Sequence, residues 1–389
     1  MPSSVPSVAV VGGGVIGLTV AWTLARRGHR VTVYDPVPAR GASWAAAGML
    51  SPAGEAWFGE ESLLRLGLAS LDRWPATAHD LEADAGWGPE LRSEGTLLVA
   101  ATDDDAGTQA RLHALMASAG ITHRLLSRRE ARALEPALHP GMHSVTEVLS
   151  DHSVNNRTLV AALLAACARR AVAFVEDTAD VMTDTGTATG VRTRRAGRHR
   201  RHEVVVVANG VGLADTAGVP GWLRTAVRPV KGEILRVRTD RPALQRTVRA
   251  DVRGRAVYLV PRADGEVVVG ATSVERGYDT AVTAEAVHDL LHDATEVVPE
   301  LRDATFVEAT AGLRPAAPDH VPLVGWTGVD GLLVASGHHR GGILLAPWTA
   351  DVVAALVAGD EPPAGWDTTD PRRFTGPAGA GLADLQETR

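Results

Sequence analysis

A glycine-rich turn near the N-terminus constrains what this chain can fold into more than any other feature. The apolar run Val8–Val11 is typical of a buried parallel strand, and it leads into Gly12–Gly17 (GGGVIG), which matches G-x-G-x-x-G. A helical pattern follows and stops at Gly28, and the run Val31–Val33 predicts a second strand that Asp35 closes. Because the glycines lie between two strands and open a helix, the segment predicts a dinucleotide-binding βαβ unit.

The residue types in this unit have distinct physical roles. Gly12 permits a tight turn, Gly14 lets the backbone approach a pyrophosphate, and Gly17 lets the helix pack closely on the strand. The first helical turn, which contains Val15 and Ile16, offers free N–H groups and a partial positive charge to phosphates.

Asp35, which Pro36 follows, is placed to accept hydrogen bonds from the hydroxyls of an adenosine ribose. Its negative charge disfavours a 2′-phosphate, so tightly bound NADP is not expected. The unit alone does not distinguish NAD from FAD, but its position at the start of a long chain favours FAD.

Composition narrows the class of protein. The length of 389 residues suggests two or three domains. Cys167 is the only cysteine, so we expect no disulfide framework and no metal site built on cysteine, and the net charge of −7 argues against nucleic acid as a partner. Apolar stretches such as Leu159–Ala168 fall short of the roughly 20 residues that a membrane span needs. Met1–Ser7 lacks the basic region of a secretion signal, so we expect a cytoplasmic enzyme without a membrane partner.

Five segments resemble one known family, in the same order along the chain. They read ASWAAAGML at 42–50, VRPVKGEILR at 227–236, YLVPR at 258–262 with VGAT at 269–272, GLRP at 312–315, and GHHRGGILLAP at 337–347. Together they resemble the glycine oxidases (ThiO) of the D-amino-acid oxidase group of FAD enzymes. The resemblance covers residues from about 8 to about 360. It implies an α/β fold with a Rossmann-like FAD-binding domain and a second, substrate-binding domain with a mostly antiparallel sheet.

The resemblance implies that both domains are discontinuous. The FAD-binding domain would take 1–85, 150–225 and 312–365, the substrate-binding domain 86–149 and 226–311, and 366–389 would form a loose tail. Hydrophobic patterns within these limits predict helices and strands. The expected helices are Asp105–Ala117, Arg128–Leu134, Asn156–Arg170 and Pro347–Val357, and the expected strands include Val204–Val207, Val230–Arg238, Ala256–Val260, Val267–Gly270 and Gly331–Ser336.

The same resemblance implies which residues contact FAD beyond the glycine-rich turn. Small residues would pass beside the pyrophosphate and flavin, Asp180 would bring backbone to the adenine, and the 338–344 segment would pass the flavin ring. No cysteine lies near the GLRP segment, so FAD is expected to be non-covalent. These residues are Ala42, Ser43, Ala47, Gly48, Met49, Asp180, His338, His339, Arg340, Gly341, Gly342, Ile343 and Leu344.

The implied reaction is oxidation of a C–N bond. A hydride passes from Cα to flavin N5, water hydrolyses the imine to glyoxylate and an amine, and O2 is reduced to H2O2. The implied carboxylate anchors are Arg314, whose guanidinium would fork onto the carboxylate, Tyr258, whose hydroxyl would donate to it, and Arg340 nearby. Each has a structural alternative: an Arg that binds loop carbonyls, a strand Tyr packed in the core, and a surface ion pair.

The sequence departs from the family at three places. His339 and Gly341 replace an aromatic residue and Asn around Arg340, Ala256 replaces a His before the tyrosine, and Asn155-Asn156 replaces Asp-Pro. If Ala256 and Gly341 line the pocket, the space beyond the substrate amine is enlarged, which favours a glycine with a bulky N-substituent. An ordinary glycine oxidase remains the alternative.

Other readings also stay open. A D-amino-acid or proline oxidase of the same fold and an NAD-linked dehydrogenase remain alternatives. A thiamine or secondary-metabolite pathway is compatible with the resemblance, as is a homo-oligomer. The role of Lys231, the only lysine, is not assigned, and His288 with His292 is interpreted as a surface pair.

Overall fold

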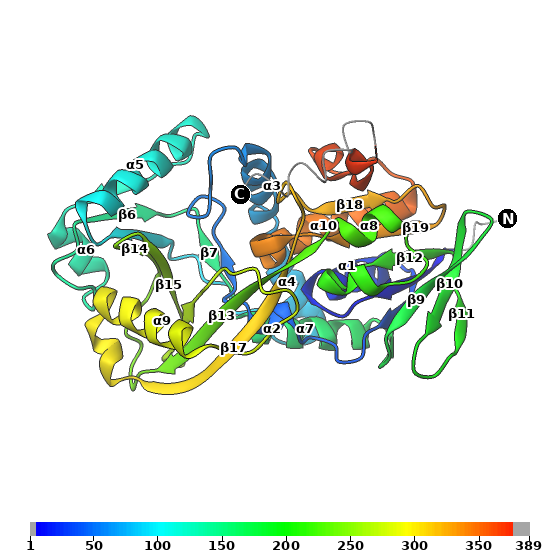
Figure 1. Cartoon of the computed structure of the whole chain (residues 1–389), viewed down its shortest axis with the longest axis horizontal. Helices are drawn as coiled ribbons and strands as arrows, with labels where there is room; N and C mark the ends of the chain where they lie inside the picture. Colours follow the sequence, from blue (N-terminus) through cyan, green and yellow to red (C-terminus); the bar gives the residue numbers. More distant parts are fainter. Residues whose placement is uncertain (1–4, 376–389) are drawn as a thin grey trace.

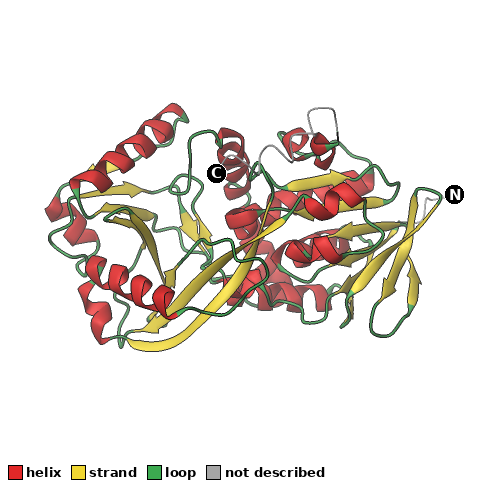
Figure 2. Cartoon of the chain, viewed as in Figure 1, coloured by secondary structure: helices red, strands yellow, loops and turns green. Residues whose placement is uncertain are grey.

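The computed structural model describes residues 5–375. Two large β-sheets lie toward opposite ends of the long axis of the molecule (Figure 1, Figure 2). One sheet has six strands and the other has eight. The long strands β13 (Arg228–Arg238) and β17 (Thr305–Ala316) run from the eight-stranded sheet toward the six-stranded one.

The six-stranded sheet has the order β18-β19-β12-β1-β2-β8, and only its β18–β19 pair is antiparallel. Valine-rich β1 and β12 are buried along almost their whole length, as strands covered on both faces require. The strands expected at Val8–Val11, Val204–Val207 and Gly331–Ser336 are therefore confirmed. The strands are β1 (Ser7–Val11), β2 (Arg30–Tyr34), β8 (Ala173–Val175), β12 (Val204–Val207), β18 (Leu323–Trp326) and β19 (Leu332–Ser336).

The two faces of this sheet are covered differently. Val8 and Val10 join the core under the helices, whereas Ala9 and Val11 join the core under a small three-stranded sheet. The helical layer contains α1 (Val15–Arg26), α3 (Glu61–Leu71), α4 (Trp74–Ala85), α7 (Asn156–Arg169) and α10 (Gly342–Ala358). The small sheet contains β9 (Ala179–Asp184), β10 (Thr187–Thr193) and β11 (His199–Arg201).

The eight-stranded sheet has the order β17-β13-β16-β15-β14-β4-β6-β5. Its pairs are antiparallel except β14–β4, so the mostly antiparallel second sheet is confirmed. Besides β13 and β17, its strands are β4 (Thr96–Ala100), β5 (Arg124–Leu126), β6 (Ser144–Val148), β14 (Thr247–Val252), β15 (Arg255–Pro261) and β16 (Glu266–Gly270).

Helices α5 (Asp103–Ser118) and α9 (Ala284–Val297) cover opposite faces of this sheet. Leu97 packs in one cluster with Leu290 of α9, whereas Leu98 packs in another with Leu115 of α5. Successive residues of a strand point to opposite faces, so the two clusters lie on opposite sides. The shorter elements are α2 (Ala42–Ala45), β3 (Met49–Leu50), α6 (Arg128–Leu134), β7 (His152–Ser153) and α8 (Gly221–Thr225).

Helix α10 begins at Gly342, before Pro347, and the expected start at Pro347 is wrong. Proline removes a helix hydrogen bond and distorts the preceding turn. The nearby carbonyl of Leu344 accepts hydrogen bonds from Ser70 Oγ (2.6 Å) and Trp74 Nε1 (3.0 Å). Buried side chains therefore keep the turn helical despite the proline, and the two donors hold the carbonyl next to the one that the proline leaves free.

The apolar stretch around α10 is also longer than the sequence analysis expected. Residues His339–Ala358 are long and apolar enough to cross a membrane by length and composition alone, but 67% of that window is buried inside the protein. Core helices pass the same test, and α10 packs against α1 and α3. The segment is therefore a core element of this fold.

Two expected boundaries need correction. The limit at 312 falls inside β17, because β17 pairs with β13 from Thr305 to Ala316 across it. The loose tail expected from 366 is wrong as far as 375, since two 3-10 helices there pack on β18 and bury Thr369 and Pro371. The rest of that tail, 376–389, lies outside the described residues.

Candidate active site

A cavity of about 1200 Å³ lies between the two sheets. The turn after β1, the segment around α2, the start of α10, strands β13 and β17 and the 54–60 segment all contribute lining residues. Most residues expected to contact cofactor or substrate line it: Gly12, Gly14, Val15, Ile16, Asp35, Pro36, Ala42, Ser43, Ala47, Gly48, Met49, Tyr258, Arg314, His338, His339, Arg340, Gly342 and Ile343. Gly17, Asp180, Gly341 and Leu344 do not.

The glycine-rich turn has the close contacts that its sequence predicts. A Cβ on Gly17 would lie 2.0 Å from the carbonyl oxygen of Gly12, so only glycine lets α1 approach the strand this closely. Gly12 itself has φ +113°, and a Cβ there would lie 2.5 Å from the oxygen of Ala208. Asp35 accepts hydrogen bonds from the N–H groups of Gly13 (2.7 Å) and Val37 (2.8 Å), which fixes the turn.

The start of α1 fits a dinucleotide. Its N-cap residue is Gly14, and no side chain caps the helix end there, although Ser43 Oγ accepts from Val15 N at 2.9 Å. The rest of the first turn therefore has N–H groups free for an anion. A Cβ on Gly14 would meet Ser43 Oγ at 3.2 Å, so a larger residue would close this cradle.

Asp180 is placed differently from expectation. Its carboxylate accepts hydrogen bonds from Arg194 and from the N–H of Ala217, inside the small three-stranded sheet. Burial acts to raise the pKa of Asp180, but the bonds from Arg194 and Ala217 outweigh it and hold this pKa below its usual range. The structure thus gives Asp180 a partner in its own sheet and does not bring it to the cavity.

Gly341 and Leu344 also face away from the main cavity. They line a small neighbouring hollow with Pro52 and Gly67. A Cβ on Gly341 would point at Leu345 Cδ1, 3.3 Å away. The lack of a side chain at Gly341 therefore does not enlarge the main cavity, and that part of the expectation is wrong. Ala256 does line it.

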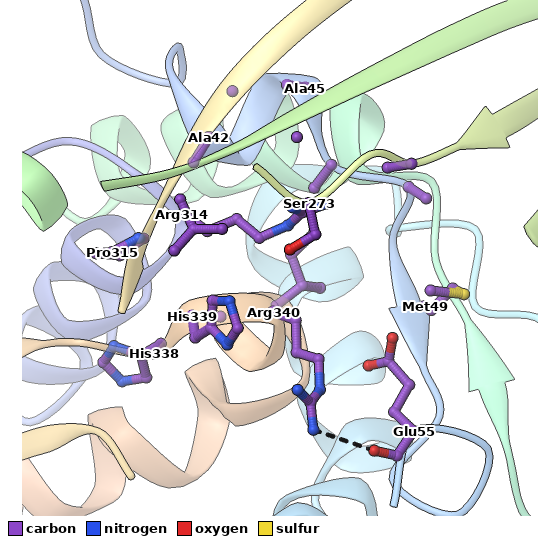
Figure 3. Close-up of a pocket in the computed structure, with 18 of the residues that line it drawn as sticks. Ala42, Ala45, Met49, Glu55, Ser273, Arg314, Pro315, His338, His339 and Arg340 are labelled. Carbon is purple, nitrogen blue, oxygen red and sulfur yellow. Dashed lines mark hydrogen bonds between the residues drawn. The ribbon is translucent and has the colours of Figure 1, made fainter. Parts of the chain in front are cut away.

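Arg314 extends from β17 into the cavity toward Ser273 (Figure 3). Its Nη1 donates to the carbonyl of Thr272 at 3.0 Å. The guanidinium lies over Gly232 on the neighbouring strand β13, where a Cβ would stand 2.4 Å from Nη2. Sequence reasoning missed Gly232, although an isolated glycine within a strand signals a close approach.

A glycine on a neighbouring strand also makes room for Tyr258. It pairs across the sheet with Gly270, and a Cβ on Gly270 would lie 2.4–2.5 Å from the phenol ring. Burial raises the pKa of Tyr258, and the nearby charge and hydrogen bond of Arg314 only partly offset this. Tyr258 therefore stays a neutral hydroxyl that can donate a hydrogen bond beside Arg314.

Arg340 lines the cavity and also forms an ion pair, which the sequence analysis named as its alternative role, although its partner Glu60 was not predicted. Its Nη2 pairs with Glu60 and donates to the carbonyl of Glu55 at 3.2 Å (Figure 3). His320 Nδ1 lies 2.6 Å from the other oxygen of Glu60, and its ring stacks on His339 with centroids 4.9 Å apart. Burial acts to raise the pKa of Glu60, but His320 and Arg340 hold it below its usual range.

The two histidines before Arg340 are neutral. Burial lowers the pKa of His338 to about 3, and its Nε2 bonds to Thr349 Oγ1 at 2.9 Å. Burial, helped by the charge of Arg340, lowers the pKa of His339 to about 3. Neither histidine adds positive charge to the cavity.

The Asn155-Asn156 departure has a structural role. Asn155 caps α7. Asn156 Nδ2 donates to the carbonyls of Ser43 and Trp44, both at 2.9 Å, and its Oδ1 accepts from Arg236 at 3.1 Å. Asn156 therefore ties the segment around α2 to the eight-stranded sheet.

The residues that the sequence left unassigned lie away from the cavity. Lys231 is fully buried and pairs with Asp279 (3.0 Å) and Glu233 (3.5 Å), so it fixes the loop after β16. His288 and His292 each bond to the adjacent aspartate. Within residues 5–375, no group of three or more His, Cys, Asp or Glu side chains could hold a metal.

Comparisons with known proteins agree with this geometry. The family described as "DAO: FAD dependent oxidoreductase" matches residues 7–356. The glycine oxidase of Geobacillus kaustophilus is 36% identical to this chain over 90% of this chain and 92% of its own length. The crystal structure of a glycine oxidase from the same organism superposes on this chain with a TM-score of 0.85 and 33% sequence identity. That superposition covers 95% of this chain and 98% of the other. A putative thiamine biosynthesis oxidoreductase ThiO of Rhizobium etli is 32% identical over 89% of this chain and 95% of its own length.

The family match spans most of the chain, and the superposition confirms the mixed α/β fold. The cradle at α1 is the part of the structure that fits the adenine dinucleotide of FAD. The chain therefore belongs to the DAO family and is an FAD-dependent oxidoreductase of the glycine oxidase type.

Proposed function

We propose that this enzyme oxidises the C–N bond of glycine-type substrates: glycine, sarcosine or bulkier N-substituted glycines. The balanced reaction is R–NH–CH2–COO⁻ + O2 + H2O → R–NH2 + OHC–COO⁻ + H2O2. The observation that carries this proposal is the placement of Arg314 and Tyr258 side by side in the cavity that the glycine-rich turn also lines.

Arg314 and Tyr258 would bind the substrate carboxylate. The guanidinium presents parallel donors to a carboxylate, and each charge-assisted hydrogen bond contributes about 1.5–3 kcal/mol. Gly232 and Gly270 leave room for the two side chains, so both are held before substrate arrives.

Arg340 adds a second positive charge in the same cavity, held by Glu60 and by the carbonyl of Glu55. His338 and His339 are neutral, so the positive charge that attracts the carboxylate comes from arginines, and Arg314 is the main candidate because Arg340 is already paired with Glu60.

FAD would be held in the same cavity by the turn Gly12–Ile16, by Asp35 and by the Ala42–Met49 segment. When bound, FAD accepts the hydride of the substrate Cα and passes the electrons to O2. The residues of this chain position the substrate and need supply no obligatory general base.

An anaerobic titration with product analysis tests the proposal. Glycine or sarcosine should bleach the visible flavin band of the holoenzyme, and readmitted O2 should yield glyoxylate and H2O2. If only D-alanine or proline bleaches the band, the substrate is a different amino acid. If only NADH reduces the flavin, the proposal is wrong.

The pathway is a further part of this proposal. The similarity to a protein named as a putative thiamine biosynthesis oxidoreductase supports a role in thiamine biosynthesis. Secondary-metabolite biosynthesis is the alternative pathway. Deletion of the gene should create a requirement for the thiazole part of thiamine if the first role holds, and prototrophy would contradict it.

A further inference from the structure

The cavity continues well past Arg314 and Tyr258, across the eight-stranded sheet and under α5. We name this part the α5 lobe and define it by six lining residues: Leu98, Gln109, Leu112, Arg249, Asp251 and Ala256. None of them belongs to the residues that would contact FAD or the substrate carboxylate.

Strand register places the lobe in line with Tyr258. Tyr258 on β15 pairs with Arg249 on β14, which in turn pairs with Leu98 on β4. Ala256 pairs with Asp251 on the same face. Directly paired residues share a sheet face, and strands lie about 4.8 Å apart, so the lobe runs roughly 10 Å beyond Tyr258.

One wall of the lobe is apolar. Leu98 packs with Leu115 of α5 and with Ala53, and Leu112 packs against this cluster. The small side chain of Ala256, opposite Asp251, leaves the middle of the lobe open. An aliphatic chain that starts near Tyr258 would therefore pass beside Arg249 and over the small side chain of Ala256 to reach Asp251.

Two hydrogen-bond acceptors face this path. Gln109 is 3% exposed, lines the cavity, and its Oε1 has no hydrogen-bond partner among the described residues. Asp251 is half-buried, and burial raises the pKa of its carboxyl, which the charge of Arg249 and a hydrogen bond with Gln109 partly offset. A buried acceptor without a donor is unfavourable, so a ligand that supplies a donor gains affinity here.

The positive groups near the lobe are less available. Arg249 is already paired with Glu55 at 2.9 Å, and Arg111 is exposed at the edge of the cavity. An acidic substituent would have to displace Glu55 or remain at the edge. The chemistry of the lobe therefore favours a hydrogen-bond donor.

We propose that the α5 lobe binds the N-substituent of a substituted glycine, and that this substituent is an alkyl chain ending in a hydrogen-bond donor such as a primary ammonium or a hydroxyl. Gln109 and Asp251 receive the donor, and Leu98 and Leu112 contact the alkyl chain. This inference rests on the proposed function, because it places the carboxylate at Arg314 and the reacting C–N bond between the two ends.

Matched substrates test the proposal in the holoenzyme. N-(3-aminopropyl)glycine, N-butylglycine and N-(2-carboxyethyl)glycine have substituents of similar length, and sarcosine has a single methyl group. We expect kcat/KM for the aminopropyl compound to exceed that for the butyl compound at least tenfold, with the carboxyethyl compound the poorest. Equal values for the aminopropyl and butyl compounds, or a preference for the carboxyethyl compound, would overturn the proposal.

Two variants test the residues. Asp251→Asn and Gln109→Leu should each lower the ratio of aminopropyl to butyl kcat/KM at least fivefold, while the visible spectrum shows that FAD stays bound. Asp104→Asn, the same chemical change at an exposed position of α5, is the matched control and should keep the wild-type ratio. Unchanged ratios in both lobe variants would refute the assignment.

A third variant tests where the alkyl part of the N-substituent lies, independently of its hydrogen-bond donor. Leu112→Trp should raise KM for N-butylglycine at least tenfold relative to KM for sarcosine. If the enzyme oxidises sarcosine but shows none of the substrate preferences or variant effects above, the assignment of the α5 lobe is refuted and the proposed function still stands. Failure of every glycine compound to reduce the flavin would refute both.

Discussion

The guanidinium of Arg314 lies directly over Gly232 of the neighbouring strand, so close that a single methyl group there would stand 2.4 Å from Nη2. The same strand pair holds Arg314 through the backbone register Val230↔Arg314 and Gly232↔Gly312. The observed position of the Arg314 guanidinium therefore depends on the absence of a side chain at Gly232.

Gly232→Ala should displace Arg314 while FAD remains bound. The added methyl group cannot coexist with the observed guanidinium position, so KM for sarcosine should rise about tenfold or more, equivalent to about 1.4 kcal/mol. Steady-state kinetics and the flavin spectrum measure the two effects. Gly221→Ala, where a Cβ meets nothing within 4 Å, is the matched control and should behave as wild type.

Arg314→Lys keeps the positive charge but removes the planar guanidinium that can donate two parallel hydrogen bonds to a carboxylate. Lysine cannot make two parallel hydrogen bonds to a carboxylate, and one lost charge-assisted bond of about 1.5–3 kcal/mol corresponds to a rise in KM of roughly 10- to 100-fold. The visible spectrum should show FAD still bound. An unchanged KM would mean that the carboxylate is anchored elsewhere.

Glu60→Gln tests the support of Arg340. Glu60 keeps a depressed pKa in the folded protein, so it holds Arg340 and His320 as an anion down to below the usual range for Glu. We expect wild-type kcat/KM to fall only in acid, as Glu60 protonates, and the variant to show the low value already at neutral pH. The pH profile of kcat/KM measures this.

The adjacent Glu61→Gln is the matched control for that experiment, because Glu61 is exposed and lies outside the cavity. A Glu60→Gln profile that overlays the wild type at every pH would show that Arg340 needs no partner. A loss of FAD from Glu60→Gln would instead assign the pair to cofactor binding.

The raised pKa of Asp151 predicts that the stability of the fold depends on pH. It is fully buried, accepts from the N–H groups of Ala53 (3.1 Å) and Gly54 (2.9 Å), and burial raises its pKa to about 7. The folded state therefore binds more protons than the unfolded state between about pH 4 and pH 7, so stability falls as pH rises through this window.

Asp151→Asn removes this proton exchange and keeps one acceptor for the two N–H groups. The variant and the wild type should have similar free energies of unfolding at pH 5, and the variant should be the more stable at pH 8. Urea unfolding at the two pH values measures this. A difference in stability between the two proteins that stays the same from pH 5 to pH 8 would show that Asp151 is ionised at both.

Local patterns were sufficient for much of the fold. The glycine-rich turn, the valine runs of β1 and β12, and the helix at Arg128–Leu134 follow from hydrophobic period and from the conformations that glycine permits. The start of α10 was missed because burial of its apolar side chains, with donors from Ser70 and Trp74, outweighs the local effect of Pro347.

The site was less predictable than the fold, because its supporting residues come together through strand register and loop packing. Strand pairing, which the sequence does not reveal, brings Gly232 beside Arg314 and Gly270 beside Tyr258. Glu60 contacts Arg340 although the two residues are 280 positions apart in the sequence. The prediction for Asp180 was wrong because its partner Arg194, which directly follows strand β10, is brought to it by a small sheet that the sequence did not predict.

The measurement that most directly tests the central claim compares a substrate with and without its carboxylate. Sarcosine and dimethylamine differ only in that group, and both can be added anaerobically to the holoenzyme while the flavin band is followed. The arrangement of Arg314 and Tyr258 predicts rapid bleaching by sarcosine and none by dimethylamine at equal concentration. Equal bleaching by both amines would contradict it, because the anchor would then contribute nothing to the reaction.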